Sequence, residues 1–405
     1  MKRTPRARST QSTWRSTRTD PADWFAPDEL DRSRRYQRPL RRLRLLRSGL
    51  GLAVAVGFIV GRLGTRVPDA LGAGGWIARL VIVVVALQLI VLVYDVPLDW
   101  WVDMVHDKRW QLSTQTTTGF VADQLKSFGI TTVLAIAVAV PMFALIRSTD
   151  AWWLWGWLLV SALSIVLGFL FPIVLAPIFN TFTRLEPGEL STRVDAVAKK
   201  AGVRITGTYV VDESRRSRRD NAYVAGLGAT RRVVLFDTLL EHPIEVVEQV
   251  VAHEIGHWRL RHLRRQLPLA VATAFVAFAF VRLLSSWDWL LDRVGLDGGI
   301  GDPAALPLLL LGAQIGFGIT SLITAFVSRA FERQADVQAL ELLGRPDQLM
   351  DMHRRIHVKN LADLDPGRLK RLLLSHPPAA ERMAMARDWS NDHAHSSAPV
   401  HRSFT

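Results

Sequence analysis

The sequence predicts a mainly α-helical, polytopic membrane bundle of about six spans with an attached α+β domain. Three observations indicate this fold class. Hydrophobic residues make up 49% of the 405 residues. Mean hydropathy is +0.16 although 21% of the residues are charged, so apolar and charged residues must be segregated along the chain. The apolar residues gather in six runs, and a polar segment of mixed helix and strand character separates the fourth run from the fifth.

Each of the six runs is a candidate membrane span, because a helix crosses a bilayer with about 20 mainly apolar residues and basic side chains can snorkel at its ends. The runs are 48–61, 71–94, 129–146, 151–183, 266–284 and 303–327. Any single run is also compatible with a buried helix of a soluble core, but six such runs in one chain favour a membrane protein. Tryptophans near the ends of several runs are typical of a membrane interface.

Positive charge is concentrated before the first span. Residues 1–47 hold 14 basic and 5 acidic residues, and they carry +9 of the formal net charge of +13. The segment is rich in Ser, Thr and Pro and lacks apolar periodicity, so we expect a disordered basic arm on anionic lipid. Nucleic-acid binding is the alternative, but few aromatic residues interleave the arginines. Membrane lipid is therefore the expected partner, and nucleic acid is not.

The distribution of Lys and Arg also predicts the orientation of the spans. With the basic arm inside, segments 95–128, 179–265 and 328–405 are inside as well. The outside loops, at about 62–75, 147–150 and 285–302, are short and carry few basic residues. We therefore expect a multi-pass protein of the cell inner membrane with both termini in the cytoplasm.

The polar segment between spans four and five reads as a folded α+β unit. A helix is expected over 187–201, and β-branched runs predict strands over 205–211, 221–225 and 232–237. Gly226 and Gly228 punctuate a hairpin between the last two strands. A long amphipathic helix is expected over 243–263, directly before the fifth span.

That helix carries an H-E-x-x-H motif, at His253, Glu254 and His257. Side chains four residues apart share one helix face, so both imidazoles can reach one metal ion, and Glu254 can take a proton from water beside it. Zinc lowers the pKa of bound water to about 7. A chance match on a polar helix is the alternative.

Because the chain has no cysteine, disulfides, thiolate metal sites and cysteine nucleophiles are excluded.

A third ligand is expected just after the last span, where Glu332 and Asp336 again lie four residues apart. The chain between His257 and Glu332 is about one apolar hairpin, so both ends return to the same membrane surface. Glu332 can then complete the metal site, and Asp336 can accept the free N–H of a ligating histidine. A solvated charged helix face is the alternative for this pair.

These motifs resemble the type I CAAX prenyl endopeptidases, a family of integral-membrane zinc metalloproteases. Besides the H-E-x-x-H helix and the segment 328–336, the resemblance rests on the residues that follow. They are Phe171-Pro172, 175–180, Asn221-Ala222-Tyr223, 233–240, 359–361, 375–378 with Arg382, and a loop from Trp110 to Lys126. The matching segments cover about residues 95–390, in the order and at the spacing of the family.

The resemblance implies a helical bundle around a water-filled chamber with an α+β zincin-type catalytic domain. It implies one zinc ion per chain, with His253, His257 and Glu332 as ligands. Glu254 would be the general base, and Asp336 would support a ligand. The family cleaves carboxy-terminal tripeptides from prenylated CAAX proteins and acts on peptide-like substrates more broadly. The expected partner is therefore a peptide or protein substrate, prenylated or not.

The resemblance also implies the residues that hold substrate. His376 and Arg382 would bind substrate or stabilise the oxyanion. Asn221, Ala222 and Tyr223 would lie on an edge strand that pairs with an extended peptide. The alternatives are a helix cap for His376 and a plain turn residue for Asn221. Two departures stand out, since the eukaryotic members have seven spans and the basic arm has no counterpart in the family.

The expected organisation follows from these segments. It comprises the arm (1–47), spans one to four with the cytoplasmic loop 95–128 (48–178), the catalytic α+β region with the zinc helix (179–265), a transmembrane hairpin (266–327), the third-ligand helix and carboxy-terminal catalytic region (328–390) and a disordered tail (391–405). Two other functions remain open. One is a quality-control membrane protease like the heat-shock family HtpX, and the other is a non-catalytic membrane scaffold.

Overall fold

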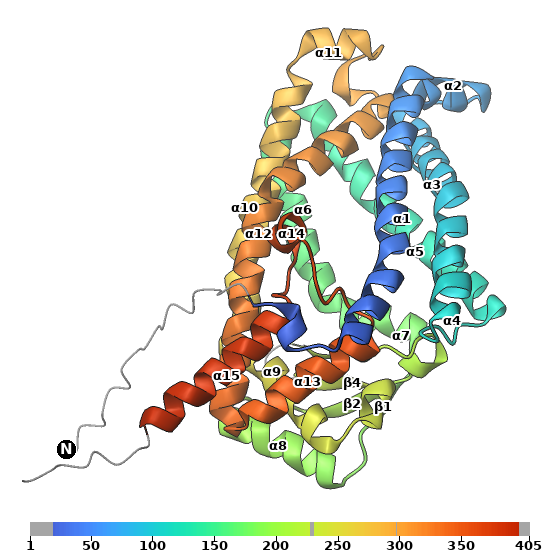
Figure 1. The fold of residues 1–405 in the computed structure, drawn as a ribbon. Helices are drawn as coiled ribbons and strands as arrows, with labels where there is room; N and C mark the ends of the chain where they lie inside the picture. The colour runs from blue at the N-terminus through green and yellow to red at the C-terminus, as the bar shows by residue number, and fades with distance from the viewer. Residues whose placement is uncertain (1–18, 227–230, 297, 397–405) are drawn as a thin grey trace, which may run out of the picture.

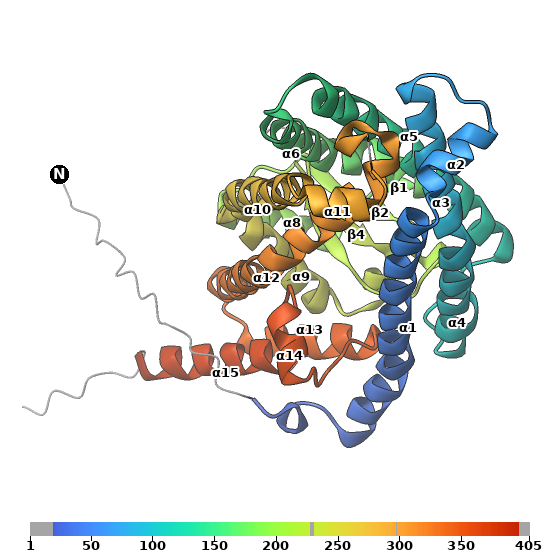
Figure 2. The same cartoon turned by 90° about the horizontal axis from the view of Figure 1, so that it is seen from above.

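The computed structural model describes residues 19–226, 231–296 and 298–396 of the chain. Long helices form a bundle, and a small domain with a four-stranded sheet lies at one end of it (Figure 1). The opposite end carries the short helices α2 (Leu63–Ala70) and α11 (Asp288–Arg293) (Figure 1). Seen from above, the bundle helices stand around a common interior (Figure 2). The predicted fold class is confirmed.

Six helices in the described part of the chain are long and apolar enough to cross a membrane, as predicted. They are built on α1 (Pro27–Val60), α3 (Trp76–Trp100), α5 (Thr117–Ser148), α6 (Trp152–Leu170), α10 (His262–Ser285) and α12 (Leu306–Leu343). Short π-helical turns at Trp101–His106 and Phe171–Leu175 join α3 to α4 (Asp107–Arg109) and α6 to α7 (Ala176–Phe179). Helix α12 continues well past its apolar part, so the predicted third-ligand segment is the end of a span rather than a separate helix.

The first helix corrects the expectation that residues 1–47 form a disordered arm. Residues 27–47 belong to α1, a 3-10 turn at Pro21–Asp23 precedes it, and residues 1–18 lie outside the described residues. Leu30, Ser33 and Tyr36 are buried at a spacing of three residues, which places them on one helix face. The arginines occupy the other faces, and their number hid this narrow buried stripe from a composition-based prediction.

The buried stripe of α1 contacts the carboxy-terminal region of the chain. Leu30 packs in an apolar cluster with Leu364 and Met383. The Ser33 hydroxyl donates a hydrogen bond to the carbonyl oxygen of Ala362 at 2.6 Å and accepts one from the backbone N–H of Leu364 at 3.2 Å. The amino-terminal half of α1 is therefore fastened to residues that lie more than 300 positions later in the sequence.

Three helices make up the carboxy-terminal region, namely α13 (Pro346–Lys359), α14 (Arg368–Leu373) and α15 (Ala379–Ser396). Helix α15 corrects the expected disordered tail, because residues 391–396 are still helical, and 397–405 lie outside the described residues. Trp389 and His393, one turn apart on α15, stack with ring centroids 3.9 Å apart. This stacking supports the last turns of the helix.

The sheet of the small domain has the strand order β1-β2-β4-β3. Its strands are β1 (Phe182–Arg184), β2 (Gly207–Val211), β3 (Ala222–Ala225) and β4 (Arg232–Phe236). The pairs β1-β2 and β3-β4 are antiparallel, and β2 and β4 are parallel. The three predicted strands are present within two residues of their expected bounds. Strand β1 was missed because three residues carry no readable alternation, and Gly228 of the expected hairpin turn lies outside the described residues.

Two helices of the small domain share its core. Helix α8 (Glu189–Ala201) and helix α9 (Ile244–Arg259) pack on each other and on the sheet, with α9 between the sheet and α12. Val247, Val251 and Ile255 of α9 are fully buried at a spacing of four residues. This apolar stripe fixes which face of α9 turns toward α12.

Helix α9 ends earlier than the sequence predicts. The expected helix over 243–263 is interrupted after Arg259, and α10 begins at His262. The backbone N–H of Arg261 bonds the carbonyl oxygen of Trp258 at 3.0 Å, which is a tightened last turn, and Arg261 adopts a left-handed φ of 56°. The chain changes direction there and enters the fifth span.

Candidate metal centre

Helix α9 presents His253 and His257 to α12, on the side away from the sheet. The Nε2 atoms of the two rings lie 3.1 Å apart. Gly256, between them, allows the close approach of the two helices, since a Cβ built there would lie 3.1 Å from the carbonyl oxygen of Ala335 and 3.1 Å from Cβ of Gln338. The H-E-x-x-H helix thus contacts α12 most closely at a glycine, because any larger residue there would be closer to α12 than an ordinary van der Waals contact.

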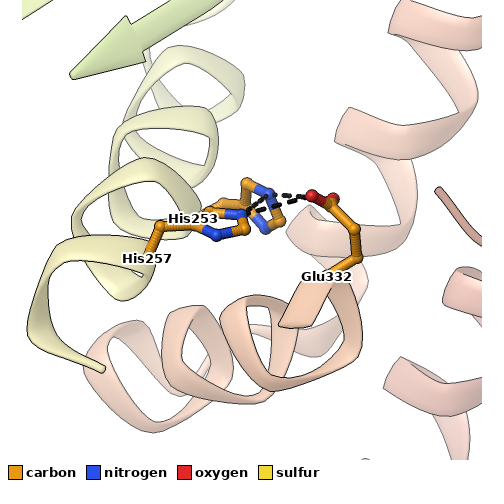
Figure 3. Close-up of side chains that lie close together, drawn as sticks. All are labelled: His253, His257 and Glu332. Carbon is orange, nitrogen blue, oxygen red and sulfur yellow. Dashed lines mark hydrogen bonds and ion pairs between the residues drawn. The ribbon is translucent and has the colours of Figure 1, made fainter. Parts of the chain in front are cut away.

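Glu332 of α12 completes a triangle with the two histidines (Figure 3). Its Oε2 lies 3.4 Å from Nε2 of His253, and its Oε1 lies 3.4 Å from Nε2 of His257. Glu332 is buried, and its Oε2 has no hydrogen-bond donor among the described residues. The sequence argument that one apolar hairpin returns Glu332 to the histidine pair therefore agrees with the geometry.

The triangle fits a zinc ion. Ligands at about 2.0–2.1 Å in tetrahedral geometry stand about 3.3 Å from one another, and the three measured separations are 3.1, 3.4 and 3.4 Å. Two imidazoles and one carboxylate are also the donor set of many catalytic zinc sites, which leave a fourth position open. The buried Glu332 oxygen without a donor is the kind of atom that a cation would satisfy.

Asp336, one turn after Glu332 on α12, holds the other side of His253. The carboxylate is fully buried, and its Oδ1 lies 2.9 Å from Nδ1 of His253. Arg382 donates two hydrogen bonds to it, at 2.7 Å to Oδ2 and 2.6 Å to Oδ1. His353 Nε2 lies 3.3 Å from the same Oδ1. A carboxylate fixed in this way orients the His253 ring with Nε2 toward Glu332.

The environment shifts the pKa values of the motif residues on α9. Burial lowers the pKa of His253, but the neighbouring carboxylates of Asp336 and Glu332 outweigh it and raise that pKa to about 9. Burial, together with the charge of His253, lowers the pKa of His257 to about 3. Burial raises the pKa of Glu254 to about 7, which suits a group that exchanges a proton near neutral pH.

The structure brings His376 and Arg382 to the same centre in different ways. His376 is the open member, with a side chain 61% exposed and its Nε2 3.3 Å from Oε1 of Glu332. Arg382 is buried behind Asp336 and also lies 3.5 Å from Oε2 of Glu332. Its two shortest contacts are both to Asp336, so the geometry gives Arg382 a supporting contact. The expectation from the resemblance, that Arg382 binds substrate or stabilises the oxyanion, stays a prediction.

Asn221, Ala222 and Tyr223 lie at the edge of the sheet. Strand β3 is the terminal strand, so its outer side is not paired with another described strand. Asn221 is exposed, and its carbonyl oxygen accepts a hydrogen bond from the backbone N–H of Phe236 at 3.0 Å. Asn221 also lines a polar cavity of about 530 Å³. The expected edge position of this segment is present.

Sequence reasoning missed three residues around the triangle. His353 and its contact with Asp336 lie on α13, which no motif marks. The Nδ1 atom of His262 lies 2.9 Å from Nδ1 of His257, the second histidine of the motif, and the side chain of Gln334 contacts His262. His262 follows His257 by five residues, and on the uninterrupted helix that the sequence predicts it would point about 140° away from the motif face. The helix break was the missing information.

Comparison with known proteins agrees with the fold. A family model described as "Peptidase family M48" matches residues 184–390, just over half of the chain. A second one, "CAAX prenyl protease N-terminal, five membrane helices", matches residues 14–181. The described part of this chain has four candidate spans in that range, so one helix of the second family's description has no counterpart among them.

Similar proteins span bacteria and eukaryotes. "Uncharacterized metalloprotease YhfN" of Bacillus subtilis is 29% identical over 391 residues, covering 95% of this chain and 91% of the relative. "CAAX prenyl protease 1 homolog" of Arabidopsis thaliana is 29% identical over 303 residues, covering 71% and 69%. The crystal structure of S. mikatae Ste24p superposes with a TM-score of 0.79 at 23% identity, covering 90% of each chain, and so shares the fold. With six apolar helices among its described residues, the chain is a multi-pass integral membrane protein that belongs to peptidase family M48, a zinc metalloendopeptidase of the CAAX prenyl protease family.

Proposed function

We propose that this chain hydrolyses peptide bonds at the triangle of His253, His257 and Glu332, with a zinc ion held by these three residues and Glu254 as the general base. The observation that carries the proposal is the set of separations of 3.1, 3.4 and 3.4 Å between the three ligand atoms, closed around a buried carboxylate oxygen that has no described donor. When bound, zinc supplies Lewis acidity that brings the pKa of water near 7.

Glu254 handles the proton in this reaction. Its raised pKa of about 7 refers to the centre without a cation, and a nearby divalent cation lowers that pKa, so the carboxylate is ionised at neutral pH. The carboxylate accepts a proton as the water oxygen bonds to the peptide carbonyl carbon. It then gives the proton to the departing nitrogen as the C–N bond breaks. Asp336 and Arg382 keep the His253 ring in place throughout.

Strand β3 supplies the place where an extended substrate would bind. An incoming peptide can pair with the open edge of the sheet at Asn221, Ala222 and Tyr223 through main-chain hydrogen bonds. His376 is positioned to contact that peptide, because it combines an exposed side chain with a 3.3 Å contact to Glu332. The proposed roles are therefore substrate pairing for the strand and substrate contact for His376.

A prenylated protein is the substrate class that we favour over unmodified or misfolded membrane proteins. An apolar cavity of about 480 Å³ lies between α3, α5, α6, α10 and α12, and its lining includes Met142, Phe278 and Phe317. Along α12, Phe317 lies 15 residues before Glu332, about 22 Å of helix, so an isoprenoid chain would extend through the bundle interior. A farnesylated peptide cleaved no faster than its plain counterpart would favour the quality-control alternative.

We infer that the protein lies in the cell inner membrane with both termini in the cytoplasm, and the arrangement of Lys and Arg supports this orientation. This orientation would place the metal centre on the cytoplasmic side, since α9 and the end of α12 lie on the same end of the bundle as both ends of the described chain (Figure 1). Protease accessibility of tags at the two ends, in sealed vesicles of known orientation, tests it.

The decisive experiment separates metal binding from proteolysis. Glu254→Gln is expected to bind one zinc ion per chain, as the parent does, and to lose peptidase activity by at least about 100-fold, the usual contribution of a general base. His253→Ala is expected to lose both. Glu245→Gln, in the first turn of the same helix, is the matched control and should keep both. Zinc content by mass spectrometry and cleavage of a farnesylated CAAX peptide are the readouts. A parent protein that binds no zinc, or a Glu254→Gln variant with parental activity, would overturn the proposal.

A further inference from the structure

His262 is a buried histidine for which the chemistry above has no use. It is the first residue of α10, and 2% of its surface is exposed. Its ring stacks on Phe331 with centroids 4.3 Å apart and an interplanar angle of 9°. Both ring nitrogens have partners, because Nδ1 lies 2.9 Å from Nδ1 of His257 and Nε2 lies 3.0 Å from Oε1 of Gln334. A ring held on both edges and one face has a fixed orientation.

The helix break aims this ring at the motif. On a continuous helix, a residue five positions after His257 would lie about 140° around the axis from it. Instead, Arg261 adopts a φ of 56°, and α10 starts at His262, whose ring lies beside the ring of His257. For a residue other than glycine, this left-handed conformation costs about 1–2 kcal/mol. The chain therefore holds an unfavourable backbone conformation at the position that brings the two imidazoles together.

The hydrogen-bond roles along this path are mutually consistent. His257 points Nε2 at His253 and Glu332, so a metal there takes the Nε2 lone pair and leaves the proton of His257 on Nδ1. That N–H donates to Nδ1 of His262, which must then be unprotonated. The proton of neutral His262 lies on Nε2 and is donated to the amide oxygen of Gln334.

The opposite orientation of the Gln334 amide would break the path. Its NH₂ group would face Nε2 of His262 and would favour the tautomer with the proton on Nδ1. Two N–H groups would then meet between His262 and His257. With its amide oxygen toward His262, Gln334 supports the tautomer that lets His257 offer its Nε2 lone pair to a cation.

We propose that His262 is a positioning residue of the zinc site, which fixes the ring and tautomer of His257 and is itself fixed by Gln334 and Phe331. The inference rests on the proposed function, because it concerns the same zinc ion. Both supports of His262 lie on α12, on either side of Glu332. Helix α12 thus supplies one zinc ligand and positions both of the others, His253 through Asp336 and His257 through His262.

The first test is His262→Phe, which keeps an aromatic ring against Phe331 and removes the acceptor. Zinc affinity, measured on the full-length detergent-purified protein by competition with a chelator, is expected to fall by about 10- to 100-fold, the usual effect of losing a partner that orients a ligand. The visible absorption bands of the cobalt-substituted protein are expected to shift, because the His257 ring is no longer held. His393→Phe, the same substitution at an exposed histidine of α15, is the matched control and should change neither readout.

A second pair of variants tests the tautomer directly. Gln334→Met keeps the length of the side chain and removes the acceptor, whereas Gln334→Glu keeps an acceptor oxygen. Because the Gln334 side chain is exposed, water can replace part of its role, so we expect Gln334→Met to weaken zinc binding by only about 3- to 10-fold. Gln334→Glu should bind zinc within about twofold of the parent. A purely structural role for Gln334 would affect the two variants alike.

The outcomes separate this inference from the proposed function. A parent protein without zinc overturns both. A parent that binds zinc, together with a His262→Phe variant that binds it within twofold and has an unchanged cobalt spectrum, overturns this inference alone. If His262→Phe does not fold, the Gln334 pair decides, and equal zinc affinity of Gln334→Met and Gln334→Glu overturns the inference.

Discussion

The contact at Gly256 predicts how a single methyl group would affect the proposed zinc site. In Gly256→Ala, the new Cβ would lie 3.1 Å from the Ala335 carbonyl oxygen and 3.1 Å from Cβ of Gln338, both fixed parts of α12. Ordinary contacts of this kind begin near 3.5 Å, so α9 and α12 must separate by about 0.4 Å. His253 and His257 flank Gly256, and Glu332 precedes Ala335 by one turn, so the displacement reaches the ligands almost undiminished.

The size of the effect follows from the ligand separations. The 3.4 Å distances from Glu332 to the two imidazoles would widen to about 3.8 Å, whereas metal sites tolerate changes of about 0.2 Å in their bonds. We therefore expect zinc affinity and kcat/KM of Gly256→Ala to fall by about tenfold each. The stability of the zinc-free protein should change by less than about 2 kcal/mol, because alanine favours the helix by about 1 kcal/mol while overpacking opposes it by about 1–3 kcal/mol.

The assay combines chelator competition, peptide cleavage and thermal unfolding of the zinc-free protein. Gly318→Ala is the matched control, because it lies on α12 with no atom within 4 Å of its added Cβ. It should leave zinc affinity unchanged. Parental zinc affinity in Gly256→Ala would refute the reasoning, since it would show that α12 yields at Ala335 without moving Glu332.

Two further predictions concern the proton on His253 and the anchor of α1. The raised pKa of His253, about 9, means that zinc must displace a proton at neutral pH. Zinc affinity should therefore rise by about tenfold per pH unit from pH 7 and level off above about 9. Zinc titrations between pH 6.5 and 9.5 check this, and a flat affinity over that range would contradict it. Ser33→Ala should lower stability by about 1–3 kcal/mol, because it leaves the partly buried carbonyl of Ala362 and the buried N–H of Leu364 without their partner. Thermal unfolding measures the loss against Ser48→Ala, at an exposed position of the same helix, and equal melting temperatures would contradict the prediction.

The parts of the fold that the sequence predicts well are those coded by local pattern. Six apolar runs predict six spans, because each span must by itself be long enough and apolar enough to cross the bilayer. The strands β2 and β4 are rich in β-branched residues and were expected within two residues of their bounds. By contrast, β1 has three residues, and its place is set by pairing with β2 rather than by its own side chains.

The candidate site divides in the same way. The spacing of His253 and His257 is a local signal, and Glu332 followed from topology, because a membrane hairpin must return to its own surface. His262 could not be expected, since its position depends on the left-handed turn at Arg261, and Arg is a poor predictor of such a turn. The buried stripe of α1 was hidden for a related reason. Leu30 and Ser33 have their partners at the far end of the chain, and the composition of this part of the helix is dominated by arginines.

The contacts of α1 with the last part of the chain set an order of events during synthesis. Ser33 and Ala362 are 329 residues apart, and at translation rates of about 5–20 residues per second the second emerges roughly 15–65 s after the first. During that interval the amino-terminal half of α1, with its many arginines, has none of its carboxy-terminal partners. The first turns of α1 are thus among the last parts of the molecule to be docked, and a nascent chain that stalls before residue 362 leaves Leu30 and Ser33 exposed to chaperones and proteases.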